Sequence, residues 1–185
     1  MQTKLGHIAN IQFGIHQTNQ VKGAIKYLLV KHFDEDFQPT LFADSYIEEN
    51  TKTVKALLQP NDVLFTGKGF RQFAWTYQES FGAVVPSSVF YVLQPDTSII
   101  LPEYLTIILN SEKMRHTFRM IGLGVAIPSI PKTELKEIKI SIPPLEQQQK
   151  IIAFAEWHQK EISLTKVILQ KKKDIFNSYL KQAID

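Results

Sequence analysis

The order of apolar and polar residues changes several times between residues 1 and 142. Short runs of strand-forming residues bounded by glycine, proline or acidic residues predict β-strands. The run "DVLFTGKGFRQFAWTY" predicts two strands around the turn Gly67–Lys68–Gly69, because glycine adopts the positive φ angles that tight turns need. Further strands are predicted in "AIKYLLVKHF" and "SSVFYVL", and alternation of apolar and polar residues predicts another over Leu135–Ile142.

Helical spacing is clearest after Pro102, because proline suits the first turn of a helix. Leu105, Ile108 and Leu109 form one apolar stripe. Ser111 is predicted to cap a second helix that ends at Gly122. Strands and helices in this order predict an α/β (α+β mixed) fold, with a compact domain over 1–142 built on a mixed twisted sheet.

The run "SIPPLEQQQKI" marks a switch from strand to helix. Each proline biases the residue before it toward extended backbone, and Pro144 also suits the start of a helix. Neither glycine nor proline occurs from Leu145 to Ala183. The sequence therefore predicts a second part, 143–185, made of one helix of about 40 residues and about 60 Å.

Apolar residues recur along this helix in a pattern close to a heptad repeat. The repeat is imperfect, because His158 and Lys172 occupy the other core position. A helix folded back on its own domain is one interpretation, and pairing with a second helix is the one we favour. The residues predicted for this helix–helix interface are Ala155, Ile162, Ile168, Leu169, Ile175, Phe176 and Tyr179.

Composition limits the classes of protein to consider. The chain has 185 residues, is 44% hydrophobic and contains no cysteine, which excludes disulfides and thiolate metal ligands. Its start, "MQTKLGHIAN", does not read as a signal peptide, and its apolar runs are shorter than the roughly 18 residues of a membrane span. Five scattered histidines show no metal-binding spacing. We expect a soluble cytoplasmic protein without cofactor, metal or membrane partner.

Charge is unevenly distributed, although the formal net charge is only +3 and the sequence pI about 9.0. His32 to Asn50 contains six acidic residues and no lysine or arginine, while basic residues gather elsewhere. Separated signs can give one basic face despite a modest total. Ordinary solvated charges explain the same pattern equally well.

The segment "GVAIPSIPKTELKEIKISIPPLEQQQKI" resembles the end of a target-recognition domain in DNA specificity subunits of type I restriction–modification systems. In that family a strand with a "PPL-x-x-Q" ending leads into a long helix. The opening "KLGHIANIQFG", which we read as a short helix or turn, resembles the start of the same domain. "NDVLFTGKG" and "LPEYLTIILNSEKMRHTF" resemble its middle, so the resemblance extends over essentially the whole chain.

The resemblance implies a non-catalytic subunit that binds double-stranded DNA. Such subunits read a bipartite target and hold two adenine methyltransferase subunits, to which a nuclease–translocase subunit can attach. A full-length member has two recognition domains separated by two antiparallel helices, whereas this chain has one of each, as a natural half-subunit or a fragment. Two-fold pairing of the helix would then give a homodimer that reads two inverted half-sites.

Residue chemistry, rather than the resemblance, nominates the DNA contacts. Lysine and arginine suit phosphate or guanine, amide side chains suit adenine edges, and glycine allows close backbone approach. Three groups meet these criteria: the turn with Lys68, Arg71 and Gln72; the loop with His16, Gln17, Thr18, Asn19, Gln20 and Lys22; and Arg115 with Arg119, one helical turn apart.

Two other classes of function remain open at this point. Glu134-x-Lys136 with Asp96 imitates part of a nuclease site, although exposed positions on the edge of the predicted strand explain it better. The chain lacks the Asn/Asp-Pro-Pro-aromatic element of an amino-methyltransferase. A dimerising scaffold that does not bind DNA is the second alternative. Glutamines 147–149 are predicted to be polar surface in either case, near the methyltransferase if the family resemblance holds.

Overall fold

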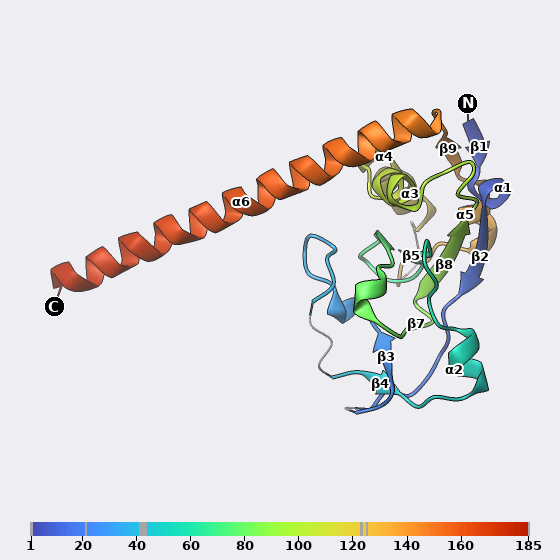
Figure 1. The fold of residues 1–185 in the computed structure, drawn as a ribbon, viewed down its shortest axis with the longest axis horizontal. Helices are drawn as coiled ribbons and strands as arrows, with labels where there is room; N and C mark the ends of the chain where they lie inside the picture. The colour runs from blue at the N-terminus through green and yellow to red at the C-terminus, as the bar shows by residue number, and fades with distance from the viewer. Residues whose placement is uncertain (1, 21, 41–43, 123, 125, 185) are drawn as a thin grey trace.

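The computed structural model describes residues 2–20, 22–40, 44–122, 124 and 126–184. It consists of a mixed α/β body from which one long helix projects (Figure 1). The largest sheet has the strand order β2-β8-β5-β6, and every neighbouring pair in it is antiparallel. These strands are β2 (Ala9–Phe13), β8 (Phe90–Pro95), β5 (Val63–Thr66) and β6 (Ala74–Thr76). β5 and β6 are the two strands predicted around residues 67–69.

Two smaller sheets complete the body. A three-stranded sheet has the order β4-β3-β7, in which β3 pairs parallel to β7 and antiparallel to β4. β1 and β9 form an antiparallel pair. Their bounds are β3 (Ile25–Leu28), β4 (Tyr46–Ile47), β7 (Val84–Pro86), β1 (Gln2–Lys4) and β9 (Lys139–Ser141). The short helical elements are α1 (Leu5–Ile8), η1 (Val30–His32), α2 (Thr51–Lys55) and η2 (Glu79–Phe81).

Both faces of the large sheet are covered, because successive side chains of a strand point to opposite faces. On β5, Val63 and Phe65 join one apolar cluster with α3 and α4, while Leu64 joins another, rich in aromatic rings. The helices α3 (Pro102–Leu109) and α4 (Glu112–Ile121) follow the predicted signals. Pro102 begins α3, and the Ser111 hydroxyl accepts a hydrogen bond from the Met114 N–H at the start of α4.

The strand predicted over Leu135–Ile142 is wrong in its first half. Residues Lys132–Glu137 form the helix α5, and only Lys139–Ser141 form a strand. Leu135 is buried on α5, which lies against α1. A Cβ atom at Gly6 of α1 would stand 2.9 Å from Lys136 Cβ, so the missing side chain of Gly6 allows the two helices to approach.

The long helix is confirmed as α6 (Leu145–Ile184), with 40 residues. It begins after Pro144, whose carbonyl oxygen accepts hydrogen bonds from the N–H groups of Gln147 and Gln148. The prediction that glutamines 147–149 are all surface residues is wrong for Gln148, which is 0% exposed. The first turns of α6 pack on α3, and Ile151 and Ile152 cover part of the core.

Candidate nucleic-acid interface

The structure brings two of the three predicted DNA-binding groups together. Residues of the β5–β6 loop and of α4 line one hollow of about 630 Å³, which we call the arginine hollow. Its lining residues are Glu35, Phe37, Phe70, Arg71, Gln72, Glu112, Arg115 and Arg119. Lys68 is exposed beside it in the same loop. The loop and helix are separated by some 40 residues of sequence, so only the tertiary fold shows that they share one surface.

The β5–β6 loop is held in a fixed shape by main-chain bonds to residues 128–130. The Gly69 N–H donates to the Pro128 carbonyl oxygen (2.8 Å), and the Ile130 N–H donates to the Gly67 carbonyl oxygen (2.9 Å). Gly69 has a φ of +102°, a conformation that favours glycine. The Gln72 amide donates to the Gly69 carbonyl oxygen (2.5 Å), so one predicted base-reading group also braces the loop.

Arg71 has a structural role that was not predicted from the sequence. Its Nη1 donates to the Phe33 carbonyl oxygen (3.2 Å) and its Nη2 donates to the Asp34 carbonyl oxygen. These bonds attach the acidic segment 34–36 to the β5–β6 loop. A guanidinium has about five N–H donors, so two such bonds do not exhaust its capacity.

Phe37 is one of the two aromatic residues among the described residues that line the hollow. Its ring stacks on Phe73, with the ring centroids 4.9 Å apart and an interplanar angle of 10°. The guanidinium of Arg115 lies 5.0 Å from the same ring, and that of Arg71 lies 5.7 Å from it. The backbone of Phe37 has a φ of 59°, a strained conformation for a residue with a bulky side chain. These contacts hold the two arginines beside one another.

The predicted separation of charges is incomplete at this surface. Glu35 and Glu112 line the hollow together with its three arginines. Asp36, from the same acidic segment as Glu35, forms an ion pair with Lys166 of α6. The arginine hollow is therefore basic but bordered by carboxylates, which disfavour phosphate on their own side.

The third predicted group, residues 16–22, lies on the three-stranded sheet. Gln20 pairs with Tyr46, the Asn19 amide donates to Ser45 Oγ (3.2 Å), and the Gln17 N–H donates to Tyr27 Oη (3.1 Å). His16 and Lys22 are exposed, and Val21 lies outside the described residues. Among the described residues that line the arginine hollow, none comes from this loop. Its amide side chains are partly used to hold the loop to β3 and β4.

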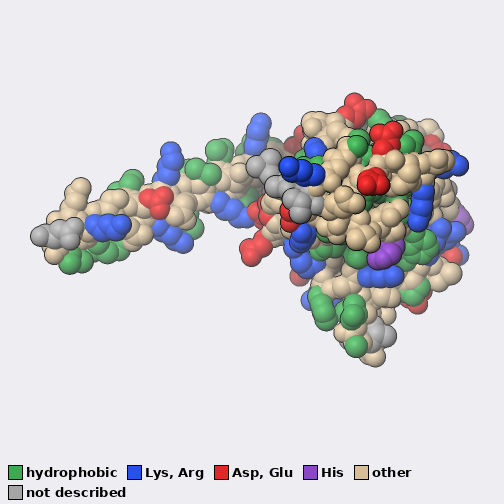
Figure 2. Space-filling view, turned by 90° about the horizontal axis from the view of Figure 1, so that it is seen from below, with side chains coloured by type: hydrophobic (Ala, Val, Ile, Leu, Met, Phe, Trp, Pro, Cys, Tyr) green, Lys and Arg blue, Asp and Glu red, His purple; other side chains and the backbone are tan. Residues whose placement is uncertain are grey.

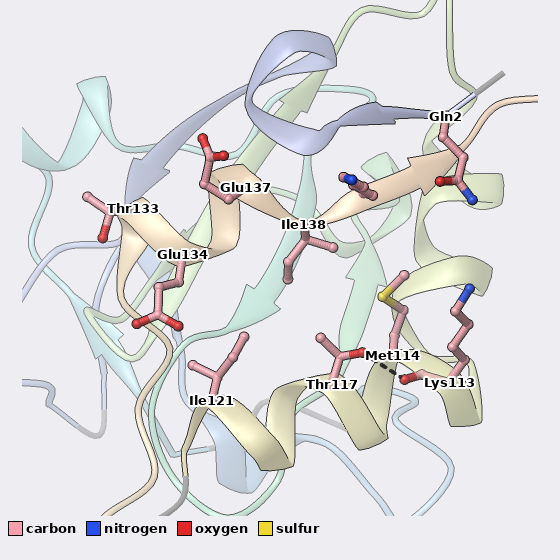
Figure 3. Close-up of a pocket in the computed structure, with 10 residues that line it drawn as sticks. Gln2, Lys113, Met114, Thr117, Ile121, Thr133, Glu134, Glu137 and Ile138 are labelled. Atoms are coloured by element: carbon pink, nitrogen blue, oxygen red, sulfur yellow. Dashed lines mark hydrogen bonds between the residues drawn. The ribbon is translucent and has the colours of Figure 1, made fainter.

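A second hollow, of about 600 Å³, lies between α4 and α5 (Figure 3). Met114, Ile121 and Ile138 form its apolar side, and Glu134, Glu137 and Lys113 stand at its rim. The nuclease-like set is not gathered here, because Lys136 and Asp96 line a different hollow. Glu134 and Lys136 lie on α5 rather than on a strand edge.

Asp96 stabilises a local turn through its side chain. Its carboxylate accepts hydrogen bonds from the Ser98 hydroxyl and N–H, which lower the pKa of Asp96. In the part of the chain that the structure describes, no group of three histidine, aspartate or glutamate side chains could hold a metal ion.

The residues predicted for a helix–helix interface divide into two sets. Ala155 and Ile162 are half-buried, on the same side of α6 as Gln148. Ile168, Leu169, Ile175, Phe176 and Tyr179 are 53–70% exposed. Figure 2 shows apolar side chains along the projecting helix, interspersed with lysines. The prediction missed Phe154, Trp157 and Leu164, which are also exposed apolar residues of α6.

The described part of the chain contains no helix that is both long and apolar enough to cross a membrane. The structure thus combines a mixed α/β body that carries a basic hollow with a projecting helix that exposes large apolar side chains. Comparison with known proteins places it more closely. Residues 4–173 match the family described as "Type I restriction modification DNA specificity domain". The chain belongs to this family.

Two curated relatives carry the corresponding names. The specificity subunit of type I restriction enzyme HindI from Haemophilus influenzae is 26% identical over 143 residues, 74% of this chain and 30% of that protein. The putative specificity subunit of type I restriction enzyme MjaX from Methanocaldococcus jannaschii is 39% identical over 61 residues, 32% of this chain and 14% of that protein. The prediction of a specificity component rather than a catalytic one is confirmed at the level of the family.

Solved structures confirm the fold. The HsdS subunit from Thermoanaerobacter tengcongensis aligns with 88% of this chain and 38% of its own, with a TM-score of 0.59 at 18% identity. The type I restriction–modification S subunit from M. genitalium aligns with 86% of this chain and 39% of its own, with a TM-score of 0.61 at 11% identity. This chain therefore spans less than half the length of the relatives that it matches.

Proposed function

We propose that this chain reads one half-site of a bipartite DNA target and positions adenine methyltransferase subunits on it, as a homodimer paired through α6. Residues 1–142 would be the DNA-reading domain, and residues 143–185 the pairing and spacing helix. Family membership supports the general role. The observation that carries the DNA-binding part is the convergence of the β5–β6 loop and α4 on one basic hollow.

The exposed side of α6 supports pairing with another helix. Ile175 and Phe176 are 70% and 60% exposed, although each is large and apolar. An identical helix related by a two-fold axis would cover this seam and would place the two reading domains at opposite ends. The dimer would then read two inverted copies of one half-site, separated by a spacer that neither domain contacts.

The exposed apolar seam of α6 is broad. Trp157 and Phe176 are 19 residues apart, which places them about 100° apart around the helix axis at about 3.6 residues per turn. Both are more than half exposed. Ile175 is 18 residues, or about five helical turns, from Trp157 and therefore lies on the same side of α6. Phe154, Trp157 and Leu164 thus extend one broad exposed seam together with the predicted interface residues.

Salt dependence of DNA binding tests the reading role. Each lost phosphate contact reduces the slope of log K against log salt by about 0.9. Replacing Lys68, Arg115 and Arg119 with alanine, in the presence of the methyltransferase, should lower affinity and flatten this slope. Lys52→Ala with Lys55→Ala, on exposed positions of α2, is the matched control. An unchanged slope in the triple variant would remove the arginine hollow from the DNA interface.

Sedimentation equilibrium at micromolar concentration tests the dimer. Ile175→Ser with Phe176→Ser should shift the wild-type dimer toward monomer. Val167→Ser is the control, because Val167 is also exposed but lies nine residues, or about 180°, from Phe176. A wild-type chain that is monomeric throughout would refute the homodimer. A dimer without salt-dependent DNA binding would instead identify the chain as a scaffold.

A further inference from the structure

Phe70 is the most exposed large apolar side chain of the described residues in the body, at 78%. It lies in the β5–β6 loop between Lys68 and Arg71, and it lines the arginine hollow. None of the aromatic ring contacts between described residues involves it. An exposed aromatic ring gains free energy when a stacking partner removes its surface from water, so a ring among cations suits an anionic partner that has apolar faces.

The loop presents Phe70 rigidly. The residues on either side are fixed, since Gly69 donates to the Pro128 carbonyl oxygen (2.8 Å) and the Arg71 carbonyl oxygen accepts from the Thr66 hydroxyl (2.8 Å). Lys68 also pairs with Ser129. A ring held on a braced loop loses little conformational freedom when it binds.

The other aromatic ring of the hollow is not available for stacking. One contact of the Phe37 ring is the stacked Phe73 ring, and the Arg115 guanidinium lies 5.0 Å from its centroid. Phe37 thus orients the arginines, and Phe70 is the ring that remains open to a ligand. Cations on both sides of an open ring match DNA, which presents apolar base faces between two rows of phosphates.

We propose that Phe70 inserts against a base step of the half-site and partly unstacks it, while Lys68, Arg115 and Arg119 hold the neighbouring phosphates. This inference rests on the proposed DNA-binding function and adds a residue that determines specificity. Partial unstacking favours flexible pyrimidine–purine steps, so Phe70 would select sequence by deformability as well as by contact. The loop therefore contributes two kinds of interaction, salt-dependent phosphate binding and salt-independent stacking.

The experiment compares full-length wild-type chain and Phe70→Ala, each with the methyltransferase. The probes are a duplex carrying the motif methylated in the host and a duplex of scrambled sequence. Phe70→Ala removes the stacking contact with one base, so affinity for the motif should fall by about tenfold to a hundredfold. Binding to the scrambled duplex and the slope of log K against log salt should not change.

Base unstacking is measured directly with 2-aminopurine placed in turn at each position of the motif. Wild-type chain should brighten one position, Phe70→Trp should retain the brightening, and Phe70→Ala should abolish it. Ile127→Ala, at another exposed apolar residue of the body, is the control and should behave as wild type.

Two results separate this inference from the proposed function. Equal losses on both duplexes, or no loss on either, would overturn the assignment of Phe70 while leaving DNA binding intact. A wild-type chain that does not distinguish the motif from the scrambled duplex would overturn the proposed function and the inference with it.

Discussion

Gln148 holds the base of the long helix to the body through buried hydrogen bonds, and Gln148→Ala is the sharpest test of that attachment. Its Oε1 accepts a hydrogen bond from the Leu101 N–H, and its Nε2 donates to the carbonyl oxygens of Ile99 and Pro143. All three distances are 2.9 Å. Leu101 immediately precedes α3, and its apolar side chain cannot cap the helix. The side chain of Gln148, from α6, accepts the hydrogen bond of the Leu101 N–H instead.

The expected cost follows from these three bonds. A typical intramolecular hydrogen bond contributes about 0.5–1.5 kcal/mol, and a buried polar group left without a partner costs more. Removing the Gln148 amide takes away a hydrogen-bond partner from three backbone groups at the buried base of α6. We expect Gln148→Ala to lower the free energy of unfolding by about 3 kcal/mol. Gln148→Glu should cost at least as much, because a carboxylate cannot donate to Ile99 or Pro143.

Urea unfolding followed by circular dichroism measures this difference. Protein concentration must be held constant, because pairing of α6 would couple dimerisation to stability. Gln149→Ala is the matched control, since Gln149 is exposed one position further along the same helix. Its effect should stay within about 0.5 kcal/mol. If Gln148→Ala and Gln149→Ala unfolded at the same urea concentration, the attachment by Gln148 would be refuted.

Two further predictions concern the body. Gly67→Ala should lower the free energy of unfolding in urea by about 1–3 kcal/mol. The added Cβ would stand 2.2 Å from Cε2 of Tyr91, whose hydroxyl donates a hydrogen bond to the Ile130 carbonyl oxygen. A loss below about 0.5 kcal/mol would contradict this packing. Burial raises the pKa of Asp62, so its ionisation destabilises the folded chain as the pH rises through that pKa. Asp62→Asn should therefore gain stability relative to wild type as pH rises from acid to neutral, and a pH-independent difference would refute this.

Local sequence signals predicted the parts of the fold that local physics decides. The glycines at 67 and 69 and the prolines at 143 and 144 restrict the backbone directly, so the β5–β6 loop and the start of α6 could be predicted. Leu135–Ile142 could not, because apolar residues at 135, 138, 140 and 142 fit a helical turn and a strand in succession. Packing of α5 against Gly6, far away in sequence, decides between them.

The candidate site shows the same limit. Chemistry nominated its arginines and Gln72, but not Phe37 or Phe70. The assembly of the hollow depends on Arg71 binding the backbone of segment 33–34 and on Phe37 contacting Arg115. The sequence pattern also places Gln148 among three equivalent glutamines. Gln148 differs from the other two glutamines only because it faces the start of α3, and the sequence near Gln148 does not indicate where α3 lies.

The attachment of α6 matters for the proposed function because the helix acts as a lever. Over the roughly 60 Å of its length, a change of about 5° at its base moves the far end by about 5 Å. That exceeds the rise of one base pair, about 3.4 Å. A dimer that measures the spacing between two half-sites thus requires a base that does not pivot. Three hydrogen bonds from one buried glutamine meet this requirement, whereas the exposed ion pair of Lys166 with Asp36 contributes about 0–1 kcal/mol.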